Sequence, residues 1–205
     1  AAREHEALPA LASRYLGQPG MMQAERHVRA AFQAAGLEIV EQPIRAVAPR
    51  TAYREVYRAA PPRPGAPHGE ALPDVDVYPL MPNHLQPVVT PPEGIDGELV
   101  LLDDATLRTR RDFTDVIGLV DAGPGGVAPD FAYHWARYAQ LGVRALIVAH
   151  RDGLGAIDWH ALLAKKSGLV SSIPVNYVRL AATPAIFDHL GERLRLRVRA
   201  DFVEH

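Results

Sequence analysis

Four imidazole and carboxylate side chains that follow one apolar run could bind a metal ion. The run Val143–Ala149 has the composition of a buried strand, and His150, Asp152, Asp158 and His160 follow it. Side chains at the end of such a strand project into the crevice beyond the sheet, and imidazole and carboxylate groups are both zinc ligands. These four residues are therefore the candidate metal ligands of the chain.

The supply of further ligands argues against a working two-metal centre here. Two zinc ions need about five or six oxygen and nitrogen ligands, and a carboxylate that acts as general base. The sequence has no Glu-Glu pair, and its one adjacent acidic pair, Asp103-Asp104, lies upstream. Two lysines, Lys165 and Lys166, follow His160. We interpret the four candidates as solvated residues at a strand end, and we expect no metal, no cofactor and no catalytic residue in this chain.

A glycine-rich turn and a row of arginines are the other features with chemical potential. Gly123-Pro124-Gly125-Gly126 stands where a phosphate-binding loop would stand, but it lacks both the Lys-Ser/Thr and the spaced glycines of such loops, so it predicts a tight turn. Arginines alternate with apolar residues near the end of the chain, at positions 193, 195, 197 and 199. This pattern predicts a solvated strand face, with a phosphate-binding stripe as the less usual alternative.

The composition bounds the class of protein. The chain has 205 residues, of which 48% are hydrophobic, so it can bury a core in one large domain or in one domain and part of another. Its formal net charge of −2 argues against nucleic acid as a partner, because nucleic-acid binding needs a basic surplus. The sequence contains no cysteine, which excludes disulfides and thiolate metal sites. No apolar run is long enough to span a bilayer, so we expect no membrane insertion.

The first quarter of the chain predicts two helices and a strand. Apolar residues at helical spacing predict a helix over residues 3–16 and a second one after Pro19-Gly20 that ends before Gly36. Leu37–Ile44 then has the pattern of an extended strand. The segment 61–73 is rich in proline and glycine and predicts a loop.

The rest of the chain predicts short strands and two helices. Proline-punctuated strands are expected over 75–78, 85–89 and 98–102. A strand over 116–120, a helix after Asp130 with Trp135, Ala136 and Ala139 on its inner face, and a strand over 143–149 form a parallel crossover. A strand over 173–178, a helix from Thr183-Pro184 to Leu190, and a strand with Leu194, Leu196, Val198 and Ala200 on one face complete the pattern.

Several stretches taken in order resemble the protease-associated domain. These are Tyr78–Pro87 and Pro92–Val100, then Asp115–Asp121, Ala136–Val148 and Ser172–Val175. The resemblance implies a mixed α+β fold, a small β-barrel or sandwich with two flanking helices. Asp112–Asp115 departs from the glycine-bearing approach that is common in the family, and Val143 replaces its alanine.

The opening residues resemble a second family. Ser13–Gly20, the helix through Gly36 and the segment Leu37–Ile44 are similar to the start of aminopeptidase-like zinc metallopeptidases, which include the transferrin-receptor-like proteins. In that family a protease-associated domain is inserted early in the catalytic domain, and Ala200–His205 would be the point of re-entry. The resemblance implies a helix-helix-strand lead-in over residues 1–48 and a protease-associated-type domain over residues 49–205.

These resemblances imply a function without chemistry in this chain. Such a module acts as a lid or as an interaction surface for a protein or peptide, and its partner would be an attached or separate peptidase domain. Copies could also associate through the apolar residues of segment 1–45. A periplasmic or extracellular location follows from the resemblance alone. Two alternatives remain open: a free-standing degenerate hydrolase that uses His150 and Asp152, and a binding module unrelated to peptidases.

Overall fold

The computed structural model describes residues 19–45, 47–61, 67–80, 88–122, 131–151 and 177–204. It divides into two compact units. The first unit is Ala1–Ala48 together with Phe202–His205, and the second is Pro49–Asp201.

The described part of the first unit is dominated by one helix, α2 (Pro19–Ala34). The helix ends as predicted at Gly36, whose φ is 70°, and the amide of Leu37 donates to the carbonyl of Phe32 at 3.0 Å. Glycine adopts this left-handed conformation without steric cost. The helix expected over 3–16 lies outside the described residues.

The strand predicted over Leu37–Ile44 is wrong. Residues 37–45 carry no regular secondary structure, and Leu37, Val40 and Ile44 are exposed. A strand needs a hydrogen-bonded neighbour to be stable, and none of the described strands pairs with this segment. The segment has the apolar pattern of a strand, but it has no pairing partner among the described strands.

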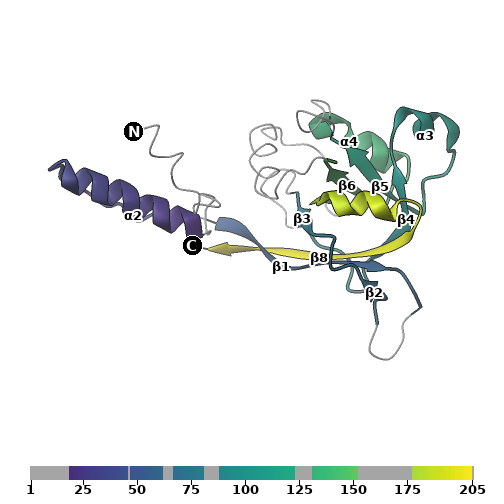
Figure 1. Ribbon diagram of the computed structural model, residues 1–205, viewed down its shortest axis with the longest axis horizontal. Helices are drawn as coiled ribbons and strands as arrows, with labels where there is room; N and C mark the ends of the chain where they lie inside the picture. The colour runs from purple at the N-terminus through teal and green to yellow at the C-terminus, as the bar shows by residue number, and fades with distance from the viewer. Residues whose placement is uncertain are drawn as a thin grey trace. The chain divides into compact units, whose positions relative to one another are not determined.

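Eight strands form one mixed sheet in the order β2-β1-β8-β4-β5-β6-β7-β3 (Figure 1). Their bounds are β1 Val47–Arg58, β2 Glu70–Ala71, β3 Val77–Pro79, β4 Ile95–Leu101, β5 Val116–Asp121, β6 Ala145–Ala149, β7 Val178–Ala182 and β8 Arg193–Glu204. Strands β4, β5, β6 and β7 are parallel to one another, whereas β8 and β3 run antiparallel on either side of them. The predicted crossover is confirmed, because α4 (Phe131–Gln140) joins the parallel strands β5 and β6.

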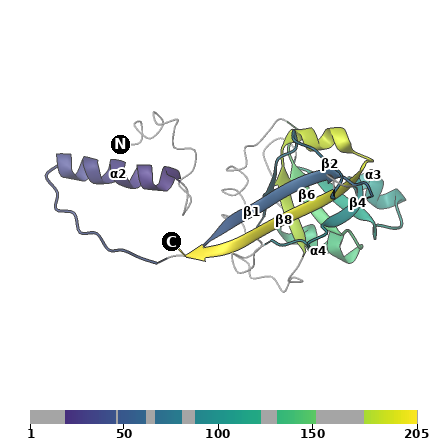
Figure 2. The same ribbon diagram turned by 90° about the horizontal axis from the view of Figure 1, so that it is seen from below.

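Helices cover both faces of the parallel strands (Figure 2). The first face carries the larger apolar cluster, which includes Leu99, Ile117, Ile147 and Leu180 and is covered by the 3-10 helix η1 (Pro184–His189) through Ile186 and Phe187. The second face carries Val116, Leu146, Val148 and Ala181. It is covered by α3 (Asp104–Thr109) through Leu107 and by α4 through Ala136 and Ala139. The side chain of Trp135 lies outside the described residues.

Strand β8 confirms the alternation predicted from its sequence. Leu194, Leu196, Val198 and Ala200 are fully buried in or beside the larger cluster. The first half of β8 pairs with β4, and its second half is bonded to residues 88–90, where the amide of Ala200 donates to the carbonyl of Val88 at 2.8 Å. Its other neighbour is β1, which lies beside it in both views (Figures 1 and 2).

The expected mixed, sheet-rich fold is confirmed only coarsely, because the described strands form one sheet that is not closed into the expected small β-barrel. The edge strands β2 and β3 do not pair with each other among the described residues. They come close, because residues 72–76 join them directly and the guanidinium of Arg54 on β1 lies 4.1 Å from the ring centre of Tyr78 on β3. Strand β2 has only two residues, and Pro79 in β3 has no amide donor, so the ladder that would close the sheet cannot form. We call this gap the open seam, and residues 72–76 the connector.

Candidate functional site

The carboxyl ends of the parallel strands are the place where the fold would position a ligand. In open sheets of parallel strands, ligands bind in the crevice beyond these ends. Here β5 ends at Asp121, and β6 ends at Ala149 and is followed by His150 and Arg151. Asp121 pairs in register with Ala149, so these polar residues meet at one edge of the sheet.

The structure places one of the four predicted metal ligands. His150 follows β6 directly and is buried, with 8% of its surface exposed, so the expectation that it is a solvated residue is wrong. Asp152, Asp158 and His160 lie outside the described residues, as does the turn Gly123–Gly126. Within the described part of the chain, no three histidine, aspartate or glutamate side chains gather closely enough to hold a metal ion. The expectation of no metal therefore stays a prediction, and a metal site at His150 and Asp152 stays the alternative.

The described residues of this edge form a packed polar contact. The Nε of Arg151 donates to the Oδ2 of Asp121 at 2.9 Å, which ties the end of β6 to the end of β5. The same guanidinium lies 4.2 Å from the ring centre of Phe187 on η1. Cation–π and ion-pair contacts of this kind fix an arginine in one orientation. This edge therefore supplies an anchored cation next to a buried imidazole.

The acidic pair Asp103-Asp104 has a structural role. Asp103 is the N-cap of α3, and its Oδ1 accepts from the amide of Thr106 at 2.7 Å. This backbone hydrogen bond holds the pKa of the Asp103 carboxyl below its ordinary value. The sequence contained the signal, because aspartate before a short helical segment is a standard N-cap, but α3 was not among the predicted elements.

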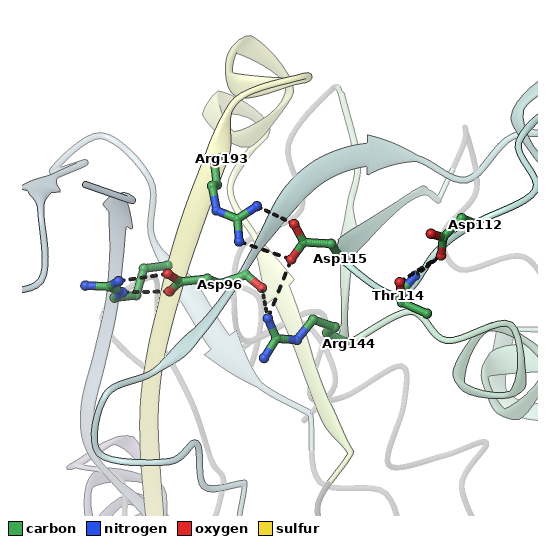
Figure 3. Close-up of polar contacts among 7 residues, drawn as sticks. Asp96, Asp112, Thr114, Asp115, Arg144 and Arg193 are labelled. Atoms are coloured by element: carbon green, nitrogen blue, oxygen red, sulfur yellow. Dashed lines mark hydrogen bonds and ion pairs between the residues drawn. The ribbon is translucent and has the colours of Figure 1, made fainter. Parts of the chain in front are cut away.

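The arginine stripe of β8 is occupied by carboxylates. Arg195 makes a two-pronged contact with Asp96 on β4, with distances of 2.6 and 2.7 Å, and Arg193 makes a similar contact with Asp115 (Figure 3). Arg197 bonds to Glu55 on β1 at 2.7 Å, and Arg199 bonds to Asp201 at 3.2 Å. Each of the four cations thus faces an anion of the same chain, which favours the solvated, structural interpretation over the phosphate site.

The stripe continues across the sheet through one further arginine. Arg144, just before β6, approaches Asp115 at 3.6 Å and donates to the backbone carbonyl of Asp96 at 2.7 Å (Figure 3). Hydrogen bonds from Arg195 and Arg193 hold the pKa values of Asp96 and Asp115 below their ordinary values. These contacts lie at the amino ends of the parallel strands, opposite the edge that carries His150.

Replacing Asp96 by asparagine is expected to lower the free energy of unfolding by about 1–3 kcal/mol, because the Arg195–Asp96 pair is the most enclosed of the stripe. The side chains are only 14% and 26% exposed. Asp201→Asn removes the same charge from a pair that is 54% and 46% exposed, so we expect a loss below about 1 kcal/mol there. Urea unfolding of both variants measures the difference.

The effect of Asp96→Asn should depend on pH in one direction. Folding lowers the pKa of the Asp96 carboxyl, so this group stabilises the protein above its unfolded pKa of about 3.9. That stability is lost as the pH falls through the folded pKa. The difference in free energy of unfolding between the wild-type protein and Asp96→Asn should therefore be constant near neutral pH and shrink in acid. A gap that widens in acid would contradict the assignment of this pair.

The sequence analysis missed a buried cation, Arg179, on the second face of the sheet. Arg179 on β7 is 6% exposed and alternates with Val178 and Leu180, which belong to the cluster on the opposite face. Burial lowers the pKa of Arg179 to about 10, and burial also raises the pKa of the neighbouring Tyr177. The sequence pattern of β7 gives no warning of this, because arginine is rarely buried.

The chain matches no protein-family model, and no curated protein matches it. None of the described helices is long and apolar enough to cross a membrane.

Proposed function

We propose that residues 49–205 act as a non-catalytic, protease-associated-type module of a zinc aminopeptidase-like protein, as a lid or as an interaction surface for a substrate or partner. In this proposal the module has a protease-associated-type fold in which the sheet stays open between β2 and β3. The sequence resemblances described above supply the family. The observation that carries the proposal is the pairing of the first and last strands of the module.

Strands β1 and β8 are neighbours along their length. The amide of Ala59, just after β1, donates to the carbonyl of Arg193 at the start of β8, at 2.8 Å. Arg45 before β1 approaches Glu204 at the end of β8, at 3.5 Å. The chain therefore enters and leaves the second unit through adjacent, oppositely directed strands, and its last residues belong to the first unit. Adjacent entry and exit points are what allow one domain to be inserted into another.

The polar chemistry of the described residues also fits a module without a reaction of its own. The arginines of β8 form ion pairs with acidic residues of the same chain. The carboxyl edge presents a buried histidine and an arginine that is already paired with Asp121. A surface of this kind can recognise a partner by shape and polarity, which suits a lid or an interaction surface.

The first test concerns zinc. The purified chain, incubated with zinc and dialysed, should retain no stoichiometric metal by elemental analysis and should not hydrolyse a leucine p-nitroanilide. His150→Gln should leave both results unchanged, since glutamine keeps a polar side chain at the buried position. Stoichiometric zinc in the wild-type chain that disappears in His150→Gln would favour the degenerate hydrolase instead.

The second test removes the module from the protein encoded by the longest reading frame that contains this chain. Because β1 and β8 are adjacent, a linker of about four residues can join Ala48 to Phe202. We expect the shortened protein to keep its zinc and its activity on small aminoacyl substrates, while its relative activity on long peptides changes. Identical selectivity with and without the module would contradict the role as lid or interaction surface.

A further inference from the structure

No strand ladder closes the gap, so the connector of the open seam is held by individual contacts. The amide of Leu72 donates to the carbonyl of Val56 on β1 at 2.9 Å, and the guanidinium of Arg54 on β1 approaches the carboxylate of Asp76 at 3.9 Å. Further hydrogen bonds join the connector to η1. Three of these bonds come from Thr183, the N-cap of η1. Its amide donates to the carbonyl of Asp76 at 2.9 Å, and its hydroxyl accepts from the amide of Asp76 at 3.1 Å and donates to the carbonyl of Asp74 at 3.4 Å. None of these backbone and hydroxyl groups titrates in the ordinary pH range, so these bonds hold the connector at every pH.

A further contact of the connector involves a histidine between two carboxylates. His189 at the end of η1 is buried, and its side chain is only 10% exposed. The Nδ1 lies 3.2 Å from the Oε2 of Glu192, and the Nε2 lies 3.8 Å from the Oδ2 of Asp74 in the connector. Hydrogen bonds from Arg58 and then from His189 hold the pKa of Glu192 below its ordinary value, so Glu192 is the ionised acceptor of the Nδ1–H.

In this arrangement the Nε2 of His189 is a hydrogen-bond acceptor when the ring is neutral and a donor when the ring is protonated. A neutral imidazole carries one proton, and if Nδ1 donates to Glu192 then Nε2 presents a lone pair to the Asp74 carboxylate. The Nε2 has no hydrogen-bond partner among the described residues. Protonation places an N–H there, and the Asp74 side chain, which is 60% exposed, is free to approach it.

We propose that His189 is a proton-operated latch on the connector of the open seam. In the protonated state His189 binds Glu192 and Asp74 together and holds the connector against η1. In the neutral state the Asp74 contact is lost and the connector relies on Thr183 and on its contacts with β1. The charged groups around the ring are Asp74 in the connector, Glu192 before β8, Arg58 on β1, which bonds to Glu192 at 2.8 Å, and Glu70 on β2, which bonds to Arg58 at 2.8 Å.

The latch controls access to part of the larger apolar cluster. Leu72 and Val75 of the connector are 6% exposed and belong to that cluster, together with Val56 on β1 and Val77 on β3. Loosening the connector exposes this apolar surface at the seam. The inference concerns the seam alone and does not depend on the proposed function.

The test is amide hydrogen exchange of the whole chain at pH 5.5 and 7.5, corrected for the intrinsic pH dependence of exchange. The protection of amides in residues 72–77 should fall about three- to tenfold from the lower to the higher pH, relative to β6, as expected for the loss of one partly enclosed ion pair. Asp74→Asn and His189→Gln should abolish this change. Asp188→Asn, which removes a carboxylate beside His189 on the exposed side of η1, should keep it.

Two results would overturn the latch. One is equal protection of the connector at both pH values in the wild-type chain. The other is a pH-dependent change that persists in Asp74→Asn. If His189→Gln does not fold, the wild-type chain and Asp74→Asn still decide the question, since Asp74 is mostly exposed and its replacement leaves the core intact.

Discussion

Ile147→Ala is expected to lower the free energy of unfolding of the second unit by about 2–5 kcal/mol, which is a large share of the roughly 5–15 kcal/mol that stabilises an ordinary domain. Ile147 lies in the middle of β6 and is fully buried in the larger cluster. Its backbone neighbours are Leu119 on β5 and Leu180 on β7, so the cavity left by the missing methyl groups is bounded by other core side chains and cannot fill with water.

The matched control removes the same atoms from the surface. Ile44→Ala deletes an isoleucine that is 76% exposed, and we expect a change within about 0.5 kcal/mol. Urea unfolding followed by far-ultraviolet circular dichroism measures both variants. Equal losses at the two positions would mean that β6 is not at the centre of this sheet.

Gly94→Ala is expected to lower the free energy of unfolding by about 3 kcal/mol, because backbone strain and a steric clash combine at this position. Gly94 closes the turn before β4 with a φ of 92°, a conformation that alanine adopts only under strain. An added Cβ would also lie 2.8 Å from the backbone carbonyl oxygen of Leu196 on β8, and backbone cannot move aside as a side chain can. The substitution therefore pushes β4 and β8 apart where they pair.

Gly191→Ala separates the two costs. Gly191 has a φ of 82°, but an added Cβ there would meet no atom within 4 Å. Gly191→Ala should therefore lower the free energy of unfolding only by the cost of the left-handed backbone conformation, about 1–2 kcal/mol. Thermal melts of the two variants give the comparison, and a Gly191→Ala protein as unstable as Gly94→Ala would show that the contact with Leu196 is unimportant.

The sequence was most informative where the apolar period and the burial agree. The alternation in β8 and the crossover through α4 were both predictable from the apolar pattern. Alternate residues of β8 from Leu194 to Ala200 are buried, and Ala136 and Ala139 of α4 pack against the cluster on the second face. The end of α2 at Gly36 was predictable for a different reason, since the left-handed conformation favours glycine by itself. In these places local pattern and tertiary structure require the same residues.

Elements whose stability comes from distant partners were not predictable. Strand β1 has one buried apolar residue among its described side chains, Val56, and its Tyr53 and Glu55 contact Arg197 on β8. Nothing local marks it as a strand. The open seam has the same origin, because closure depends on whether β2 and β3 can exchange hydrogen bonds, and neither strand is apolar enough or long enough to reveal this.

The candidate site was predictable only as a position in the fold. The prediction placed His150 at the end of a buried strand, and the structure has it directly after β6. The contact of Arg151 with Asp121 and Phe187 was not predicted, because it joins the ends of two strands to η1. The arginine stripe was visible in the sequence, but its partners Asp96, Asp115 and Glu55 are far from it along the chain.

The pairing of β1 with β8 also sets the order in which the sheet can be completed during synthesis. Arg58 and Glu192, which bond to each other, are 134 residues apart in the sequence. Strand β1 can therefore pair early with β2, but it gains β8 as its second neighbour only after the intervening strands have been made. Strands β4, β5 and β6 pair over much shorter separations and can assemble first. Until β8 leaves the ribosome, the edge of β4 stays uncovered and can pair with other chains. A nascent chain should therefore be most prone to aggregation in the interval between the emergence of β4 and that of β8.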